Sequence, residues 1–400
     1  MNEVSGTVER GYEAVRDGFA AGQIPDEGGA QLCVYRHGRK VADLWTGRDK
    51  INNRPYTDQT ITVLMSCSKG AMATAAHMLV ERGLLDLDAP VTKYWPEFGK
   101  AGKQDVPVSY LLSHRVGLTS FEPQSGVGAR ELLNWEMCTS ALEAMEPLWE
   151  PGTSNMYHAV TYGYLVGEVI RRVSGKTPGK FLADEISKPL GLDLWIGLPE
   201  SEEHRVAPHF TDRATMTLEQ WKGLLAGFNI DINSRVAQTM MHMLISTDEA
   251  IEIINTRPGH AAEIPAANMI GNARSLAKMY AATIGEVDGV RLLKRETMER
   301  AREPQTEGLK APGDFAKLPN PDPQRLALGY ELNRKTEPML GDGSFGHAGA
   351  GGRLGFAHPE SGFAVGYVCN NMLWDGIRGP DDRWIPWTRA LNDIIAAKTV

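Results

Sequence analysis

Cysteine is scarce in this chain, which has only four among its 400 residues. They are widely and irregularly spaced, at Cys33, Cys67, Cys138 and Cys369. Such spacing provides neither the paired ligands of a zinc knuckle nor the framework of a disulfide-rich domain. We therefore predict free, mostly buried thiols in a protein of a reducing compartment.

Positive charge is also in short supply. The chain has 42 Lys and Arg against 50 Asp and Glu, which gives a net charge of −8. A protein that binds nucleic acid carries a basic run or stripe, and the sequence shows no such run. We expect no nucleic-acid partner.

Long apolar runs are missing as well. No segment approaches the roughly 20 apolar residues that a transmembrane helix requires. Residues 1–19 lack the basic start and the apolar centre of a signal peptide, and their pattern is typical of an amphipathic helix. We expect a cytoplasmic protein with no membrane partner.

Several familiar motifs are absent or out of context. The sequence has no G-x-S-x-G nucleophile elbow and no H-E-x-x-H zinc motif. Residues 341–346 match G-x-G-x-x-G, but a strand-like run follows where a dinucleotide site requires a helix. We predict a turn there, and neither a metal nor an organic cofactor.

The order of the elements that are present predicts an α+β protein. Strand-like runs occur near both ends of the chain, and the middle is rich in helical periodicity. We predict an antiparallel sheet flanked by helices from residues 1–65 and 255–400, a mainly helical lobe from residues 66–254, and an active site in the cleft between them. The predicted helices are 6–22, 66–83, 158–173, 272–284 and 384–397, and the predicted strands are 30–38, 40–47, 325–333, 345–359 and 362–372.

A serine and a lysine stand three residues apart in "LMSCSKG", where an apolar run meets a helix. Three residues nearly complete a helical turn, so Ser66 and Lys69 project from neighbouring positions on one face. The helix N-terminus favours an oxyanion, and burial makes a lysine release its proton more easily. The pair is therefore a candidate nucleophile and base, although the bare pattern also fits an ordinary helix start.

Two further segments provide groups that such a pair requires. Tyr157 follows a Pro-Gly turn at the start of a predicted helix, where its phenol could face Ser66 and Lys69. In "GSFGHAGAGGRLGF", small residues follow His347 along a predicted strand. Missing side chains let main-chain N–H groups approach a ligand closely, as an oxyanion hole requires.

Longer stretches of the chain resemble the serine β-lactamase-related hydrolases, which include class C β-lactamases, DD-peptidases and family VIII carboxylesterases. The likeness covers nearly the whole chain and is strongest to the esterase branch. It implies a β-lactamase/transpeptidase-like fold and a serine hydrolase that works through an acyl-enzyme. Among the stretches that carry it are "SCSKGAMATAAHMLVERGLLDLDAPVTKYWPEF", "VSYLLSHRVGL", "EPGTSNMYHAVTYGYLVGEVIRRVSGKTP" and "GHAGAGGRLGFAHPESGFAVGYVCNNM".

The resemblance implies roles for three residues of the reaction. Ser66 would be the acylated nucleophile, and Lys69 would hold its proton network. Tyr157 falls at the position of the family's motif tyrosine, which exchanges protons with the nucleophile and the leaving group. Whether Lys69 or Tyr157 deprotonates Ser66 stays open at this point, because the two would titrate as a coupled pair.

The resemblance also implies a substrate-binding strand. His347, Ala348 and Gly349 fall where many relatives have Lys-Thr-Gly. Ala350 would supply one N–H group of the oxyanion hole, and Ser66 would supply the other.

Two departures from the family pattern favour neutral esters over β-lactams. His158-Ala159 replaces a small residue followed by asparagine, so we expect His158 to contact substrate in place of the lost amide. His347 replaces a lysine, and a histidine is only partly charged near neutral pH. We predict a carboxylesterase for small, short-acyl esters, while a β-lactamase, a D-amino-acid amidase or peptidase, an acyltransferase and a silent scaffold stay open. The sequence does not predict an oligomeric state.

Overall fold

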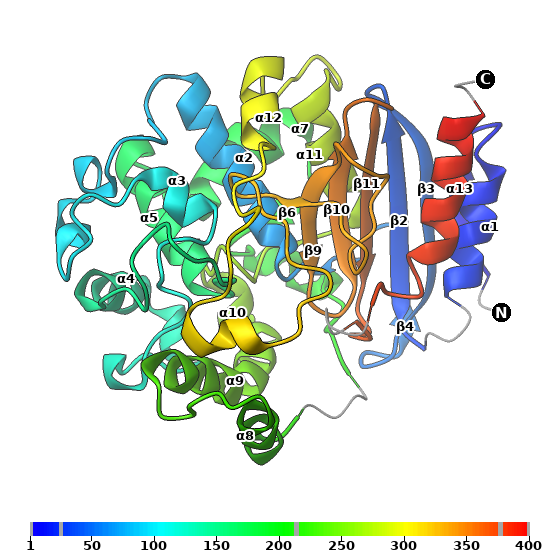
Figure 1. Ribbon diagram of the computed structural model, residues 1–400. Coiled ribbons are helices and arrows are strands. Elements are labelled where there is room, and N and C mark those ends of the chain that lie inside the picture. Colours follow the sequence, from blue (N-terminus) through cyan, green and yellow to red (C-terminus); the bar gives the residue numbers. More distant parts are fainter. Residues whose placement is uncertain (1–2, 24–26, 212–215, 375–378, 398–400) are drawn as a thin grey trace.

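An antiparallel sheet built from both ends of the chain dominates the computed structural model (Figure 1). The structure describes residues 3–23, 27–211, 216–374 and 379–397. The strand order is β1-β3-β2-β11-β10-β9-β8, with β4 paired to β3. These strands are β1 (Ser5–Val8), β2 (Gly29–Arg36), β3 (Arg39–Asp49), β4 (Arg54–Pro55), β8 (Glu331–Leu332), β9 (Phe345–Gly349), β10 (Arg353–His358) and β11 (Phe363–Cys369). The predicted α+β class is confirmed.

Helices cover both faces of this sheet. Along β2, Leu32 and Val34 pack in the core beneath α1 (Glu13–Gly22) and α13 (Ile385–Ala396), whereas Cys33 lies in the core on the other face. On that face α11 (Ala273–Ile284) lies directly on β11. A Cβ atom on Gly366 would stand 2.4 Å from the Ala273 carbonyl oxygen, so only glycine permits this approach.

The middle of the chain forms a group of helices beside the β9 side of the sheet (Figure 1). This arrangement supports the division at residues 65 and 255, which stays a prediction. The helices are α3 (Val108–Leu112), α4 (Trp135–Ala144), α5 (Thr161–Ser174), α6 (Pro178–Phe181), α7 (Lys188–Leu190), α8 (Leu218–Gly227), α9 (Arg235–Ile254) and α10 (Arg257–Ala261), and α12 (Arg295–Ala301) follows α11.

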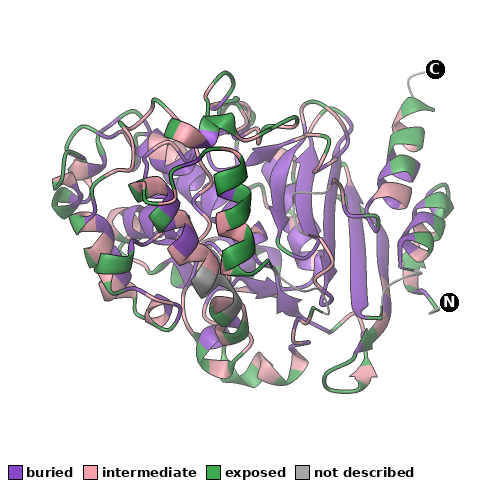
Figure 2. Cartoon of the chain, turned by 60° about the horizontal axis from the view of Figure 1, so that its bottom comes forward, coloured by how far each residue is buried: buried purple, intermediate pink, exposed green. Residues whose placement is uncertain are grey.

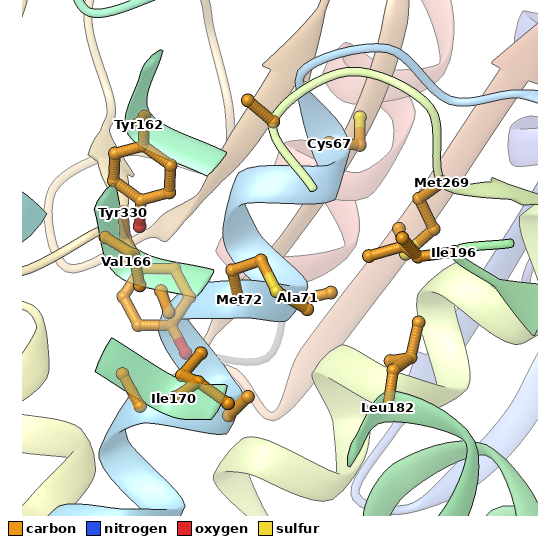
Figure 3. Packing of buried hydrophobic residues seen from close by; sticks show 14 of the residues in the cluster. Cys67, Ala71, Met72, Tyr162, Val166, Ile170, Leu182, Ile196, Met269 and Tyr330 are labelled. Atoms are coloured by element: carbon orange, nitrogen blue, oxygen red, sulfur yellow. The ribbon is translucent and has the colours of Figure 1, made fainter. Parts of the chain in front are cut away.

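Helix α2 (Cys67–Glu81) runs between the sheet and these helices and is buried over most of its length (Figure 2). Figure 3 shows Met72 of α2 beside Tyr162, Val166 and Ile170 of α5. Its small residues, Ala71 among them, let neighbours pack closely on several sides. A helix enclosed in this way holds its first residue, and the serine before it, in a fixed place.

The N-terminal segment differs from the prediction. We expected one helix over residues 6–22, but residues Ser5–Val8 form β1, and α1 begins only at Glu13. Gly6 has a φ of 109°, and a Cβ atom there would stand 2.0 Å from the Asp43 carbonyl oxygen. Pairing with β3 therefore overrides the amphipathic pattern.

A second, three-stranded sheet was not predicted. It consists of β5 (Thr62–Val63), β7 (Ile270–Gly271) and β6 (Leu194–Trp195), in the order β5-β7-β6. Strand β5 leads into Ser66, so this sheet ties the Ser66 segment to two distant parts of the chain.

Each of the four cysteines is a buried free thiol. None of the helices in the described ranges has the length and apolar character needed to cross a membrane. Within those ranges, no cluster of three or more His, Cys, Asp or Glu side chains could hold a metal ion.

Candidate active site

Ser66 stands immediately before α2 and is partly exposed. The preceding residue, Met65, has a φ of 49°, a left-handed conformation that costs about 1–2 kcal/mol for a residue with a Cβ atom. Ser68 stabilises this bend, because its Oγ donates to the Met65 carbonyl at 2.5 Å and accepts from the Met269 N–H at 3.0 Å. The bend presents the Ser66 hydroxyl in the positive field of the helix N-terminus.

Lys69 is completely buried, with its amine beside Ser66. The Nζ atom lies 3.1 Å from Ser66 Oγ, 2.7 Å from the Ala159 carbonyl oxygen and 2.9 Å from the Ala266 carbonyl oxygen. Burial lowers the pKa of Lys69 to about 7, against an opposing influence of Glu331. A neutral amine has two N–H bonds and one lone pair. The two carbonyls take the N–H bonds, so the lone pair is left for the Ser66 proton.

Tyr157 completes the group around Ser66. Its ring centre lies 4.8 Å from Lys69 Nζ, and the Ser66 hydroxyl lies close enough to lower the pKa of the phenol. Burial and the nearby Glu331 carboxylate raise the pKa of Tyr157 well above its usual value, so the phenol keeps its proton at neutral pH. The structure thus brings together the three residues that the sequence singled out.

His114 holds Tyr157 in place by stacking. Its ring lies between those of Tyr157 and Tyr162, at centroid distances of 4.9 Å and 5.0 Å. Its Nδ1 accepts from the main-chain N–H of His158 at 2.9 Å, and burial lowers its pKa well below the usual value. We did not count His114 as a site residue, although the stretch "VSYLLSHRVGL" in the family resemblance contains it.

His158 is turned toward the main chain of its own loop and of the segment at Leu118. Its side chain is fully buried, with Nδ1 at 2.7 Å from the Met156 carbonyl oxygen and Nε2 accepting from the Leu118 N–H at 3.1 Å. Both ring nitrogens are therefore used by the main chain, and burial lowers the pKa of His158 to about 3. This geometry argues against the expected substrate contact and for a role in fixing the loop around Tyr157.

Strand β9 brings His347 to the other side of the site. The imidazole centre lies 6.1 Å from the Tyr157 ring centre. Burial, reinforced by the nearby Lys69 amine, lowers the pKa of His347 to about 3, so the ring is uncharged. Ala348 donates its N–H to Glu331 Oε2 at 2.8 Å, which ties β9 to β8.

The end of β9 approaches the segment that leads into Ser66. A Cβ atom on Gly349 would stand 2.4 Å from the Leu64 carbonyl oxygen, so this approach requires glycine. Ala350 follows and is exposed. Within the described part of the chain, the main-chain N–H groups of Ser66 and Ala350 have no hydrogen-bond acceptor.

Arg353 links these two segments from behind, and we had not predicted it. Its side chain is fully buried; Nε donates to the Val63 carbonyl at 3.1 Å and Nη1 to the Ala350 carbonyl at 2.8 Å. One guanidinium therefore binds the strand before Ser66 and the residue after β9. An arginine in a glycine-rich strand offers no sequence signal that it points inward.

Comparison with known protein families matches residues 15–385 to the Beta-lactamase family. The chain belongs to the beta-lactamase family. Its relatives include "Esterase/beta-lactamase LipL" of Mycobacterium tuberculosis, which is 32% identical over 365 residues, or 86% of this chain and 78% of that protein.

Solved structures of this family support the same fold. A crystal structure of a family VIII carboxylesterase is 33% identical, with a TM-score of 0.82 over 97% of this chain and 98% of that chain. EstA from Arthrobacter nitroguajacolicus Rue61a is 28% identical, with a TM-score of 0.81 over 99% and 100%. The β-lactamase/transpeptidase-like fold is confirmed, and the protein is a serine hydrolase of the esterase and β-lactamase-like type.

Proposed function

We propose that this protein is a serine carboxylesterase that hydrolyses small, short-acyl esters through an acyl-enzyme on Ser66. The observation that carries the proposal is the buried Lys69 amine, 3.1 Å from Ser66 Oγ, with uncharged hydrogen-bond partners. Two of the similar proteins, the family VIII carboxylesterase and "Esterase/beta-lactamase LipL", have esterase names. The uncharged His347 also favours esters, since a β-lactam carries a carboxylate that needs a positive partner.

In acylation, Lys69 acts as the base. It takes the Ser66 proton through its lone pair while Oγ attacks the ester carbonyl. We assign this role to Lys69 because its pKa is lowered to about 7, whereas the Tyr157 phenol is held protonated. Tyr157 then gives its proton to the leaving alcohol oxygen and regains one from the Lys69 ammonium.

The negative charge of the tetrahedral intermediate would rest on the N–H groups of Ser66 and Ala350. Both are free to donate, and Ser66 lies at the N-terminus of α2, where the helix dipole adds to the effect. Water then enters in place of the alcohol and gives its proton to the Tyr157–Lys69 pair. The intermediate collapses to the acid, and Ser66 recovers its proton from Lys69.

The proposal is tested by turnover of p-nitrophenyl acetate, butyrate and octanoate, and of nitrocefin, in the wild type and in Ser66→Ala. We expect the esters to be hydrolysed, the shorter ones faster, with about a 1,000-fold or larger loss in the variant. Ser201→Ala, which removes an exposed hydroxyl elsewhere, should keep full activity.

Other outcomes would overturn parts of the proposal. Full ester turnover by Ser66→Ala would exclude Ser66 as the nucleophile. Nitrocefin turnover as fast as that of the esters would favour a β-lactamase. Transfer of the acyl group to an added alcohol in preference to water would favour an acyltransferase.

A further inference from the structure

The surroundings of His347 determine which ring nitrogen carries its hydrogen. Nδ1 lies 2.7 Å from the Ala348 carbonyl oxygen and 3.2 Å from Glu331 Oε2. Both partners are acceptors, so Nδ1 must carry the hydrogen. A neutral imidazole has only one N–H group, which leaves Nε2 as a bare acceptor. The lowered pKa of His347, about 3, is consistent with this neutral form.

The Nε2 atom of His347 is not completely covered, although the side chain as a whole is only 1% exposed. It has no hydrogen-bond partner within the described part of the chain, yet it is not among the fully enclosed polar atoms that lack a partner. His347 lies beside Tyr157, which in the proposed reaction protonates the leaving alcohol. The acceptor therefore lies on the alcohol side of the scissile bond.

Glu331 contributes a buried carboxyl group to this side of the site. Its carboxylate is buried and accepts from the Ala348 N–H at 2.8 Å and from Gln324 Nε2 at 2.7 Å. Burial raises the pKa of Glu331, and these donors oppose that change. A carboxylate on the substrate would meet both a lone pair and a like charge here.

We infer that His347 selects esters whose alcohol part carries a hydrogen-bond donor, such as a hydroxyl group, and disfavours those whose alcohol part carries a carboxylate. The inference rests on the proposed function, and it specifies which chemical class of alcohol the substrate ester contains. At this position the relatives with Lys-Thr-Gly have a cationic donor, and this chain has a neutral acceptor.

Three butyrate esters test the inference, because they share one acyl group and hence one acyl-enzyme. They are propyl butyrate, hydroxyethyl butyrate and butyryloxyacetate, with kcat/KM measured from released butyrate. For the wild type we expect hydroxyethyl butyrate to be preferred over propyl butyrate by about tenfold, the value of one added hydrogen bond, and butyryloxyacetate to be the poorest substrate.

Two variants of His347 sharpen the test. His347→Phe keeps a ring but removes the acceptor. The ratio of kcat/KM for hydroxyethyl butyrate to that for propyl butyrate should therefore fall from about ten to about one. His347→Lys supplies a cation and should raise butyryloxyacetate above propyl butyrate. As a matched control, His204→Phe makes the same change at an exposed histidine elsewhere in the chain and should leave the ratios unchanged. Thermal unfolding of each variant shows whether it is folded.

The outcomes separate the inference from the proposed function. Equal turnover of the three esters by the wild type, abolished in Ser66→Ala, would overturn the inference and leave the esterase standing. A wild-type preference for butyryloxyacetate would also overturn it. If none of the three esters is hydrolysed, or if Ser66→Ala hydrolyses them, the proposed function fails as well.

Discussion

The two sides of the site differ in whether their buried groups carry charge. On the helical side, Lys69 and Tyr157 are surrounded by rings and main-chain carbonyls, and among the described residues the lysine has no acidic hydrogen-bond partner. The strand side keeps buried charges, with Glu331 behind β9 and a Glu337–Arg334 ion pair close by. Burial, with help from Glu331, raises the pKa of Glu337 to about 7.

This difference separates two tasks. A lysine that must accept a proton requires surroundings that disfavour its ammonium form, so the helical side is built from uncharged groups. A surface that discriminates between substrates benefits from fixed charges and dipoles, which the strand side provides. Substitutions of the proton-transfer groups on the helical side should therefore have different effects from substitutions of the charged groups on the strand side.

The largest effect should come from Lys69→Arg. Arginine keeps the positive charge but stays protonated at all relevant pH values, so it cannot take the Ser66 proton. We expect kcat/KM for p-nitrophenyl butyrate to fall by about 1,000-fold or more. Lys103 is the matched control, since it too is fully buried and donates to main-chain carbonyls of Glu143 and Met145.

Lys103→Arg should lower the melting temperature and leave kcat of the folded enzyme unchanged. If Lys69→Arg kept its activity within tenfold of the wild type, Lys69 would not be the base. The argument from its lone pair would then be wrong.

A smaller loss is expected for Tyr157→Phe, which removes the proton donor but leaves Lys69 in place. General acid catalysis contributes about 10²–10⁴-fold, and with Lys69 still in place we expect kcat to fall near the lower end of that range, by about 100-fold. Tyr162→Phe is the control, because the Tyr162 hydroxyl is buried on the same ring stack without a hydrogen-bond partner in the described structure. Removing that hydroxyl should preserve activity and preserve or raise stability. Equal losses in both variants would show that packing of the rings, rather than proton transfer, explains the effect.

The helical side was easier to predict from the sequence than the strand side. Ser66 and Lys69 share one helix turn, and Tyr157 begins a strongly periodic segment, so local spacing indicated all three. The same reasoning misjudged His158, because adjacency in the chain does not determine which way a loop residue points. Its inward direction is seen only from the two hydrogen bonds between its ring and the main-chain groups of Met156 and Leu118.

The strand side depends on long-range contacts that no local pattern contains. Glu331 meets His347 across two paired strands, and Arg353 joins β5 to the turn after β9. Strand β5 has only two residues and is too short to show an alternating pattern. The predicted strand over residues 325–333 is wrong in length, since only β8 (Glu331–Leu332) forms there. The larger strands and helices were predictable because each contributes several periodic residues to the core.

Substitution of Arg353 should have an intermediate effect. Arg353→Met removes both hydrogen bonds that join Val63 and Ala350, so the two N–H groups of the oxyanion hole lose their relative position. We expect kcat to fall by about 10- to 100-fold with little change in KM, because the transition state depends on this geometry more than substrate binding does. Arg353→Lys keeps a donor in a single ammonium group, so its kcat should lie between that of Arg353→Met and that of the wild type.

A structural defect alone would not produce that pattern. If Arg353→Met lowered the melting temperature but left kcat of the folded enzyme unchanged, the arginine would stabilise the fold without positioning the oxyanion hole. A rise in KM at constant kcat would contradict the prediction in another way, since it would indicate lost substrate binding.

The smallest effect is a shift of the pH profile in Glu331→Gln. Only neutral Lys69 can act as the base, so kcat/KM should rise as the pH passes upward through the Lys69 pKa of about 7. The Glu331 carboxylate favours the ammonium form and raises that pKa, whereas the facing His114 and His347 have pKa values lowered by burial and are neutral. Removing the carboxylate should therefore move the acidic limb to lower pH, by about half a unit.

Glutamine can still accept from the Ala348 N–H, so β9 should keep its place and the rate at high pH should change little. Glu337→Gln is the control, because that carboxylate pairs with Arg334 and should affect Lys69 less. The measurement is kcat/KM for p-nitrophenyl butyrate across the neutral pH range. A limb that did not move would mean that the charge on the strand side does not reach Lys69, and that the two sides of the site act independently.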